Sequence, residues 1–333
     1  MIGWRRTRAI IIRSVWRSSE RTAARNGSNL SWREITDWVK RREELLHLAD
    51  FMGRGRGRTR WLDHLNAPPA ARLKPDLSNW GEQSLAAVWL GHATVLLRVG
   101  ETTILTDPVL FNRVGIGLGL ITGGPRRHVA PALSIGELPA IDLMLISHAH
   151  YDHLDRPTLV RLNKNIPIIT AERTVDLLRD LGFRRVTELR WGESAELGEV
   201  RVTAQKVAHW GARTFIDNHR GYNAYVIEGA KRRVLYGGDT AFQDYFKEVG
   251  KVDLAVLGIG GYDPYLASHA TPEQAWMMAD HLRADHLLPM HHSTFRLSHE
   301  PTGEPMERLM TVAGTGRDRI VLTEVGGQWE GGR

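Results

Sequence analysis

Short apolar runs, bounded by glycine, proline and charged residues, recur along the chain from about residue 85 onward. Runs of this length and composition predict β-strands. Later in the chain they alternate with stretches whose apolar residues recur at helical spacing. The predicted strands cover 86–90, 94–99, 103–107, 141–146, 186–190, 199–207, 223–228, 233–237, 253–258, 286–289 and 319–323. The predicted helices cover 157–163, 172–181, 241–249, 272–283 and 304–311.

This order of elements indicates an α/β chain with many strands, and it matches a simple doubly wound sheet poorly. Residues 111–139 are rich in glycine and proline, and this composition predicts a long loop. The sequence shows no internal repeat and no apolar run long enough to span a bilayer.

The amino-acid composition excludes several classes of protein and several types of catalytic group. The chain has 333 residues, of which 42% are hydrophobic and 25% charged, as in globular proteins, so collagen, wholesale disorder and a polytopic membrane protein are excluded. It contains no cysteine, which excludes disulfides, thiolate metal sites and cysteine nucleophiles. Catalysis would therefore depend on histidine, carboxylate, hydroxyl or lysine groups, or on a metal.

The positive charge is concentrated at the start of the chain. Residues 1–60 carry 15 basic and 6 acidic side chains, a net charge of +9, while the remaining residues carry −3. An arm of this charge indicates an anionic partner, either a phospholipid surface or a nucleic acid. Tryptophan and isoleucine residues within 4–16 would share one side of a helix, which is typical of an interfacial helix; a frayed basic tail is the alternative.

The sharpest chemical feature is a histidine cluster that begins directly after the predicted strand at 141–146. His148, His150, Asp152 and His153 lie within six residues. Imidazole and carboxylate groups are natural ligands for divalent transition metals. A tight loop at a strand end can turn alternate side chains toward one point. The first two histidines would then face one ion, and the next two residues a second.

Three further candidates follow predicted strands elsewhere in the chain: His209, Asp239 and His291. Asp239 comes after two glycines, which let the backbone turn sharply. A single histidine or aspartate at a strand end is more often structural than metal-binding. The joint occurrence of all three at strand ends is what indicates a shared site.

Together these motifs resemble the metallo-β-lactamase superfamily, whose signature has the form His-x-His-x-Asp-His. The likeness runs from about residue 89 to about residue 295. Within the superfamily the chain is most similar to N-acyl-phosphatidylethanolamine-hydrolysing phospholipase D and its bacterial relatives. The segments that carry this closer likeness are 89–94, 106–108, 124–127, 137–139, 146–155, 209–210, 258–262 and 289–291. The resemblance implies a four-layer αββα sandwich over residues 61–333, preceded by the basic arm and linker 1–60.

The resemblance also implies two metal ions joined by a shared carboxylate. The first ion's ligands would be His148, His150 and His209, the second ion's would be Asp152, His153 and His291, and Asp239 would bridge them. The family has tryptophan where this chain has His292, so His291 is the expected ligand of this histidine doublet. Zinc is the expected metal, although manganese and iron also suit such ligands.

In such a site the ion pair lowers the pKa of a shared water, and the resulting bridging hydroxide attacks the substrate. Asp152 and Asp239 would be the catalytic carboxylates. His92 and Asp107 would lie behind the ligands, where a carboxylate bonded to a ligating imidazole fixes its tautomer. His269 corresponds to a family histidine near the site, and it would bind substrate phosphate or assist proton transfer.

Arg126 and Arg127 allow two interpretations. They would pair with an anionic substrate, or they would belong to a solvated loop.

The expected function is hydrolysis of a phosphodiester, with an N-acylated phospholipid as substrate. A lactonase, esterase or phosphodiesterase acting on a small phosphorylated metabolite is the first alternative. A membrane- or nucleic-acid-binding protein that acts through residues 1–60 is the second. We expect a cytoplasmic enzyme with a peripheral membrane contact through this arm. A nucleic-acid partner is not favoured, and the resemblance suggests a homodimer.

Overall fold

The computed structural model describes residues 67–118, 121–214 and 217–331. The predictions for the basic arm and for the domain boundary near residue 60 lie outside the described residues.

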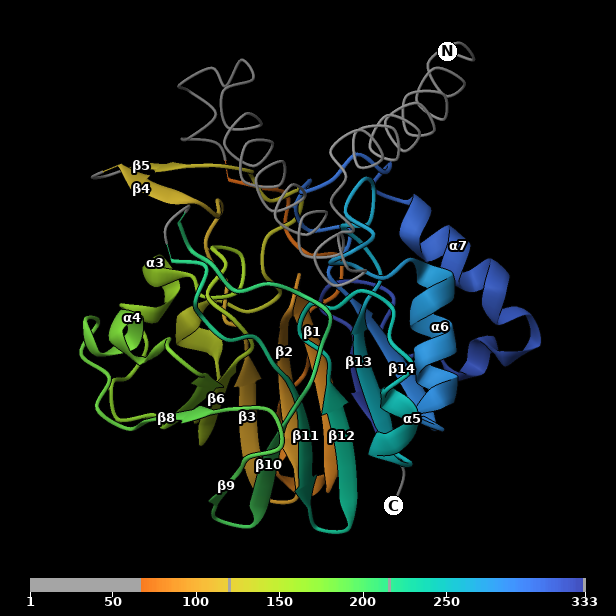
Figure 1. Ribbon diagram of the computed structural model, residues 1–333, viewed down its shortest axis with the longest axis horizontal. Helices are drawn as coiled ribbons and strands as arrows, with labels where there is room; N and C mark the ends of the chain where they lie inside the picture. The colour runs from red at the N-terminus through yellow and green to blue at the C-terminus, as the bar shows by residue number, and fades with distance from the viewer. Residues whose placement is uncertain (1–66, 119–120, 215–216, 332–333) are drawn as a thin grey trace, which may run out of the picture. The chain divides into compact units, whose positions relative to one another are not determined.

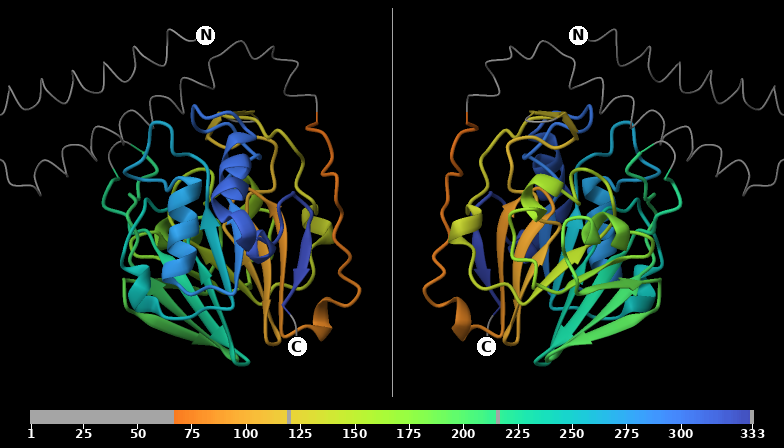
Figure 2. Two further views of the ribbon diagram at one scale, coloured as in Figure 1. Left: turned by 90° about the vertical axis from the view of Figure 1, so that its right-hand side faces the viewer. Right: turned by 90° about the vertical axis from the view of Figure 1, so that its left-hand side faces the viewer.

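Two β-sheets pack face to face in the described part of the chain (Figures 1 and 2). The first sheet has the order β15 (Gln328–Glu330), β1 (Leu85–Gly91), β2 (Thr94–Val99), β3 (Thr102–Thr106), β6 (Leu143–Ile146), β7 (Ile168–Ala171) and β8 (Val186–Leu189). The second sheet has the order β14 (His286–Met290), β13 (Leu254–Gly258), β12 (Arg232–Tyr236), β11 (Ala224–Gly229), β10 (Val200–Gln205) and β9 (Ser194–Leu197). A separate hairpin pairs β4 (Ile116–Leu118) with β5 (Ile121–Gly123).

The space between the two sheets is filled by apolar side chains from both. Leu96 and Leu105 of the first sheet and Val202, Ile227 and Val234 of the second belong to one cluster, and none is more than 1% exposed. In β10 buried residues alternate with more exposed ones, because successive strand side chains point to opposite faces. The burial of this apolar surface holds the sheets together.

Helices cover the outer faces of the sandwich. Figure 1 shows α3 (Arg156–Leu159) and α4 (Val175–Arg179) beside the first sheet. It shows α5 (Phe246–Val249), α6 (Pro272–His281) and α7 (Glu304–Ala313) beside the second. Leu235 of β12 and Leu257 of β13 pack in one cluster with Met278 of α6 and Leu309 of α7. The expected αββα sandwich is therefore confirmed.

The sequence defines α6 well because it starts with a complete capping box. The hydroxyl of Thr271 accepts a hydrogen bond from the Gln274 N–H, and the Gln274 side chain accepts one from the Thr271 N–H. Pro272 occupies the first helical position, where its missing N–H costs nothing. No helix in the described part of the chain has the length and apolar character needed to cross a bilayer.

Several predicted elements differ from the structure. The strand predicted at 319–323 is wrong: residues 314–319 form the 3₁₀ helix η4 (Gly314–Arg319), and only a single bridge joins Ile320 to Leu287. Leu322 has a φ of 57°, which an extended strand cannot contain. The predicted helix 172–181 shrinks to α4 because Arg173, with a φ of 59°, prevents an earlier start.

The other predicted helices that shorten markedly are 157–163, which becomes α3, and 241–249, which becomes α5. The strands that the sequence pattern missed are β4, β5, β7, β9 and β15. The described part also contains two further 3₁₀ helices, η2 (Trp80–Glu82) and η3 (Ile135–Glu137). The missed strands have three or four residues each, too few to establish a periodic pattern.

The strand directions bring chemically important loops to one edge of each sheet. In the first sheet β3, β6, β7 and β8 run parallel, so their carboxyl ends lie on the same side. In the second sheet β12, β13 and β14 run parallel, and β10 has the same direction because two antiparallel pairings separate it from β12. The loops that leave these ends carry the candidate site.

Candidate metal centre

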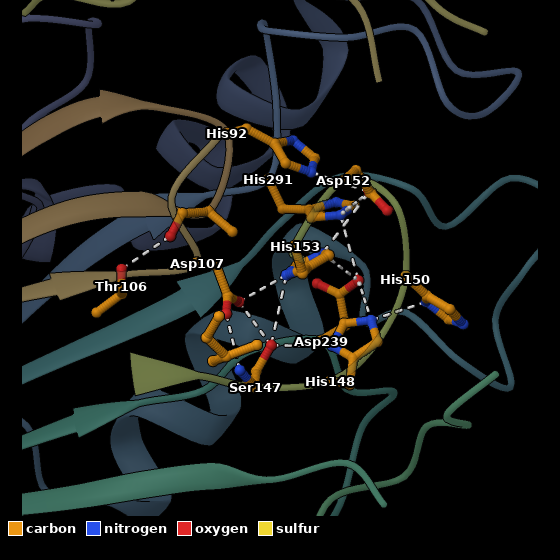
Figure 3. Close-up of polar contacts among 12 residues, drawn as sticks. His92, Thr106, Asp107, Ser147, His148, His150, Asp152, His153, Asp239 and His291 are labelled. Atoms are coloured by element: carbon orange, nitrogen blue, oxygen red, sulfur yellow. Dashed lines mark hydrogen bonds and ion pairs between the residues drawn. The ribbon is translucent and has the colours of Figure 1, made fainter. Parts of the chain in front are cut away.

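All seven side chains expected as ligands meet where these strand ends converge. Figure 3 labels all of them except His209. The loop after β6 supplies four of them, while the chain following β10, β12 and β14 supplies one each. Each is at most 8% exposed. The expected ligands are His148, His150, Asp152, His153, His209, Asp239 and His291.

The first cluster joins three histidines to Asp239. His150 Nδ1 lies 2.7 Å from His148 Nε2 and 3.3 Å from His209 Nε2. Asp239 Oδ2 lies 3.9 Å from His148 Nε2 and 3.8 Å from His209 Nε2. Four ligand atoms thus surround one point.

The second cluster contains Asp152, His153 and His291, with His92 beside them. Asp152 Oδ2 lies 3.6 Å from His153 Nε2 and 3.5 Å from His291 Nε2. The same oxygen lies 3.0 Å from His92 Nε2, so His92 contacts the expected ligand Asp152 directly. This contact agrees with a supporting position for His92, which we infer as its role.

Asp239 lies between the two clusters. Its Oδ2 is 3.0 Å from His153 Nε2 and 3.3 Å from His291 Nε2, in addition to its distances from the first cluster. Its other oxygen, Oδ1, is buried and has no hydrogen-bond partner among the described residues. A buried carboxylate oxygen without a partner costs several kcal/mol in protein but is the normal state of a metal ligand.

The donor set therefore fits divalent ions. Nitrogen ligands bound tetrahedrally at about 2.0–2.1 Å from one ion lie roughly 3.3–3.4 Å apart. The separation of His209 and His150 nitrogens, 3.3 Å, matches this value, while the 2.7 Å separation of His148 and His150 would have to open slightly.

Asp107 orients one of these histidines from behind. Its Oδ2 lies 2.6 Å from His153 Nδ1, so the Nδ1–H donates to the carboxylate and Nε2 faces the site. The same carboxylate accepts hydrogen bonds from the Ser147 N–H at 2.7 Å and from the Ser147 hydroxyl at 2.5 Å. Tyr236 donates a fourth, at 2.6 Å. On the other side, His209 Nδ1–H donates to the Ser268 carbonyl at 2.9 Å, which likewise leaves Nε2 facing the site.

Strained backbone occurs at the same strand ends. His92, Asp107 and His291 have φ values of 56°, 30° and 62°, a left-handed region that L-residues seldom adopt. Each such residue costs on the order of 1–3 kcal/mol, and such strain clusters at functional sites. Gly238, with a φ of 53°, comes so close to Ser147 that an added Cβ would lie 2.7 Å from the Ser147 Cβ.

Burial and charge together set the protonation states of these groups in the metal-free protein. Burial and the neighbouring imidazoles lower the pKa of His148 well below its usual value, so this ring is neutral. Burial alone would raise the pKa of Asp239, but the imidazoles of His153 and His291 lower it well below normal. Conversely, burial alone would lower the pKa of His153, but Asp239, Asp152 and Asp107 raise it well above normal. The carboxylates are thus ionised and ready to bind a cation.

Comparison with known proteins identifies the family. A model of the beta-lactamase superfamily domain matches residues 102–292, more than half of the chain. An uncharacterized protein of Mycobacterium tuberculosis H37Rv is 33% identical over 261 residues, covering 74% of this chain and 69% of that protein. N-acyl-phosphatidylethanolamine-hydrolyzing phospholipase D 1 of Caenorhabditis elegans is 32% identical over 275 residues, covering 75% of this chain and 76% of the relative.

The chain belongs to the metallo-β-lactamase superfamily.

A solved structure has the same fold. The isothiocyanate hydrolase from Delia radicum gut bacteria superposes with a TM-score of 0.62 at 18% identity, covering 74% of this chain and all of that one. The resemblance inferred from the histidine motifs is therefore confirmed. This metallo-β-lactamase superfamily protein is a metal-dependent hydrolase.

The structure also places the histidine doublet and His269. His291 lies among the candidate ligands, whereas His292 is outside these groups: its ring centre lies 4.6 Å from that of Trp89, and its Nδ1 contacts the Ser293 hydroxyl. His269 lies beside the site: its Nδ1 is 3.9 Å from Asp239 Oδ2, and its ring stacks 5.2 Å from that of His291.

Both interpretations of Arg127, as a substrate contact and as part of a solvated loop, are wrong. Its side chain is 2% exposed, and its guanidinium donates to the backbone carbonyls of Val109 and Phe111 while lying 5.0 Å from the Phe295 ring centre. Arg127 therefore fastens the loop after β3 to the segment that follows β14. Arg126 forms a single β-bridge with Arg113.

One residue that holds the histidine loop is absent from the sequence-based predictions. Arg213, four residues after His209, is 8% exposed and inserts its Nη1 between two backbone carbonyls, Ala149 at 3.0 Å and Leu154 at 2.8 Å. Its guanidinium also lies 4.2 Å from the ring centre of Tyr151. Arg213 thus holds both ends of the histidine loop, and no motif in the sequence indicates it.

Proposed function

We propose that this hydrolase cleaves a phosphodiester bond of an N-acylated phosphatidylethanolamine, releasing phosphatidic acid. The observation that carries the proposal is the 32% identity to the C. elegans N-acyl-phosphatidylethanolamine-hydrolyzing phospholipase D 1 over three quarters of both chains. A mitochondrial enzyme of the same printed activity from Saccharomyces cerevisiae is 30% identical over 285 residues. The paired clusters described above supply a centre suited to this reaction.

We propose two zinc ions for this centre, one in each cluster. The ligands of the first would be His148, His150 and His209, those of the second Asp152, His153 and His291, and Asp239 would be shared. When bound, such ions lower the pKa of a water and neutralise charge on the phosphoryl oxygens. Histidine-rich sets with carboxylates suit zinc without excluding iron or manganese.

The chain's own residues supply orientation and proton transfer. Asp239 Oδ2 lies within 3.0–3.9 Å of nitrogens from both clusters, so it holds their separation. Asp152 accepts a hydrogen bond from His92 through Oδ2, the oxygen that also lies 3.5 Å from His291 Nε2. We propose that His269, which lies beside Asp239, binds a phosphoryl oxygen or donates a proton to the leaving alkoxide.

The test uses purified full-length protein loaded with zinc. N-acyl-phosphatidylethanolamine in mixed micelles should be converted to phosphatidic acid, detected by mass spectrometry. The Asp152→Ala variant is the matched control, and it should lose about 10³-fold or more in kcat because a ligand and a catalytic carboxylate disappear together. Absence of turnover with zinc, manganese and iron would refute the phospholipid assignment. Turnover of only a soluble phosphodiester or phosphorylated lactone would instead support the small-metabolite alternative.

We also propose that residues 1–60 contact the anionic lipid surface that presents such a substrate. The net charge of +9 in this segment supports the proposal, since each basic residue near an anionic membrane contributes about 1 kcal/mol.

A further inference from the structure

Each of the two clusters combines residues from both sheets. His148, His150, Asp152 and His153 follow β6 of the first sheet, whereas His209, Asp239 and His291 follow strands of the second. Because metal–ligand distances vary by only about 0.2 Å, the two sheets must keep a fixed relative position. The apolar interior between them is non-directional and does not by itself supply such precision. Directional hydrogen bonds across the interior do.

Two buried tyrosines form such bonds. Tyr225 of β11 and Tyr236 of β12 are directly paired neighbours, so their side chains project from the same face of the second sheet. Both are 0% exposed. The Tyr225 hydroxyl donates to the Ile146 carbonyl, at the end of β6, at 2.9 Å. The Tyr236 hydroxyl reaches the end of β3 and donates to Asp107 Oδ2 at 2.6 Å, with the Ala93 carbonyl at 3.0 Å.

The two tyrosines differ in what they hold. Tyr225 contacts a backbone carbonyl, and its hydroxyl also accepts a bond from the Asn223 amide at 3.3 Å. Tyr236 contacts a carboxylate that itself binds His153 Nδ1. Burial raises the pKa of both phenols, so each keeps its proton and acts as a donor to the first sheet.

The ionised carboxylate of Asp107 needs such hydrogen-bond donors because it is buried. Its side chain is 0% exposed, and a buried carboxylate is tolerated only when hydrogen bonds compensate for lost hydration. Ser147 supplies two of the donors from the first sheet, and Tyr236 supplies the only one from the second sheet among the contacts of the described residues. The position of Asp107 relative to the second sheet therefore depends on Tyr236.

We propose that Tyr236 is a positioning residue for the second metal subsite, acting through Asp107 on His153. The tyrosine fixes the carboxylate, the carboxylate holds the proton on Nδ1, and Nε2 is thereby directed at Asp239, whose Oδ2 lies 3.0 Å away. Tyr225 strengthens the same junction without acting on a ligand. The inference rests on the two-ion assignment of the proposed function and adds a residue to it.

The chain offers a matched pair of variants, Tyr236→Phe and Tyr225→Phe. Each removes one buried phenolic oxygen and keeps the ring, so both metal-free proteins should show a similar decrease in melting temperature. Zinc affinity is measured by competition with a chromophoric chelator, which resolves the two binding steps. Y236F should weaken the second ion by about tenfold, the loss typical of partners that orient a ligand, and Y225F by less than about twofold.

A second measurement is independent of metal. In protein with ¹⁵N-labelled histidine and no metal, the Nδ1–H resonance of His153 should shift in Y236F and stay in place in Y225F. Equal zinc affinities in the two variants, with no difference at this resonance, would overturn the inference while leaving the proposed function intact. Wild-type protein that binds fewer than two ions would overturn the two-ion assignment and the inference together.

Discussion

Arg213→Met removes the cation that holds the histidine loop. The Met side chain retains much of the stem's apolar volume but none of the donors. The carbonyls of Ala149 and Leu154, which bracket His150, Asp152 and His153 in sequence, then lose their common partner. We expect the loop to become more mobile, so that the candidate ligand atoms it carries lose their fixed relative positions.

The expected loss of stability follows from three contributions. Each hydrogen bond from a charged donor to a buried carbonyl is worth about 1.5–3 kcal/mol, and the contact with the Tyr151 ring about 1–2 kcal/mol. Against this, burial lowers the pKa of Arg213 to about 10, a penalty of roughly 3 kcal/mol for keeping the charge. The Arg213→Met variant should therefore lose about 3 kcal/mol of its free energy of unfolding.

Urea unfolding of the metal-free protein measures this loss, and chelator competition measures zinc affinity. We expect the affinity to fall at least tenfold, because both clusters take ligands from the loop. Arg213→Lys should recover part of both losses, since one ammonium can donate to both carbonyls.

Arg308→Met is the control. Arg308 also lies over a tyrosine ring, that of Tyr262 at 4.8 Å, but its ion pairs with Glu273 and Glu304 are partly exposed on α6 and α7. The Arg308→Met variant should lose about 1 kcal/mol or less of its free energy of unfolding, and its zinc affinity should be unchanged. If Arg213→Met left zinc affinity within about twofold of wild type, the assigned role of Arg213 would be refuted.

Three further predictions test the charges of the site and the arm. Asp239→Asn should reduce bound zinc from two equivalents to one or fewer, measured by elemental analysis, because an amide cannot bridge two cations; two retained equivalents would contradict a shared ligand. Burial opposes the shift, but Asp239 and Asp152 raise the pKa of His291 to about 9. This shift contributes up to about 3 kcal/mol to the free energy of unfolding of the metal-free protein. The contribution is fully present below about pH 6.5, the pKa of histidine in the unfolded chain, and is lost as the pH rises to about 9. Urea titrations at both pH values check this, and a constant stability would contradict it. Replacing Arg5, Arg6 and Arg8 with Gln should weaken sedimentation with anionic vesicles by about fivefold per residue at low salt, without changing turnover of a soluble substrate; unchanged sedimentation would count against the arm.

Local sequence pattern was enough to predict the chemistry of the site. His148, His150, Asp152 and His153 follow an apolar run in a signature that specifies both ligand type and spacing. The strand that precedes them is recognisable because all four residues of β6 are buried and apolar. The long capped helix α6 is equally visible, since its start is encoded within four residues. Features of this kind depend on neighbours in the chain.

Contacts between distant segments were decided only by the tertiary structure. The three-residue strand β15 exists because β1 offers it a hydrogen-bonding edge, and no periodic pattern can announce so short an element. In the sequence Arg127 is indistinguishable from a surface charge, whereas in the structure its guanidinium is buried among backbone carbonyls. Arg213 and Tyr236 carry no motif, since their roles depend on groups 64 and 129 residues away. The sequence by itself thus determined which side chains are candidate metal ligands, whereas burial and directional bonds across the two sheets decided which other side chains hold these candidates in place.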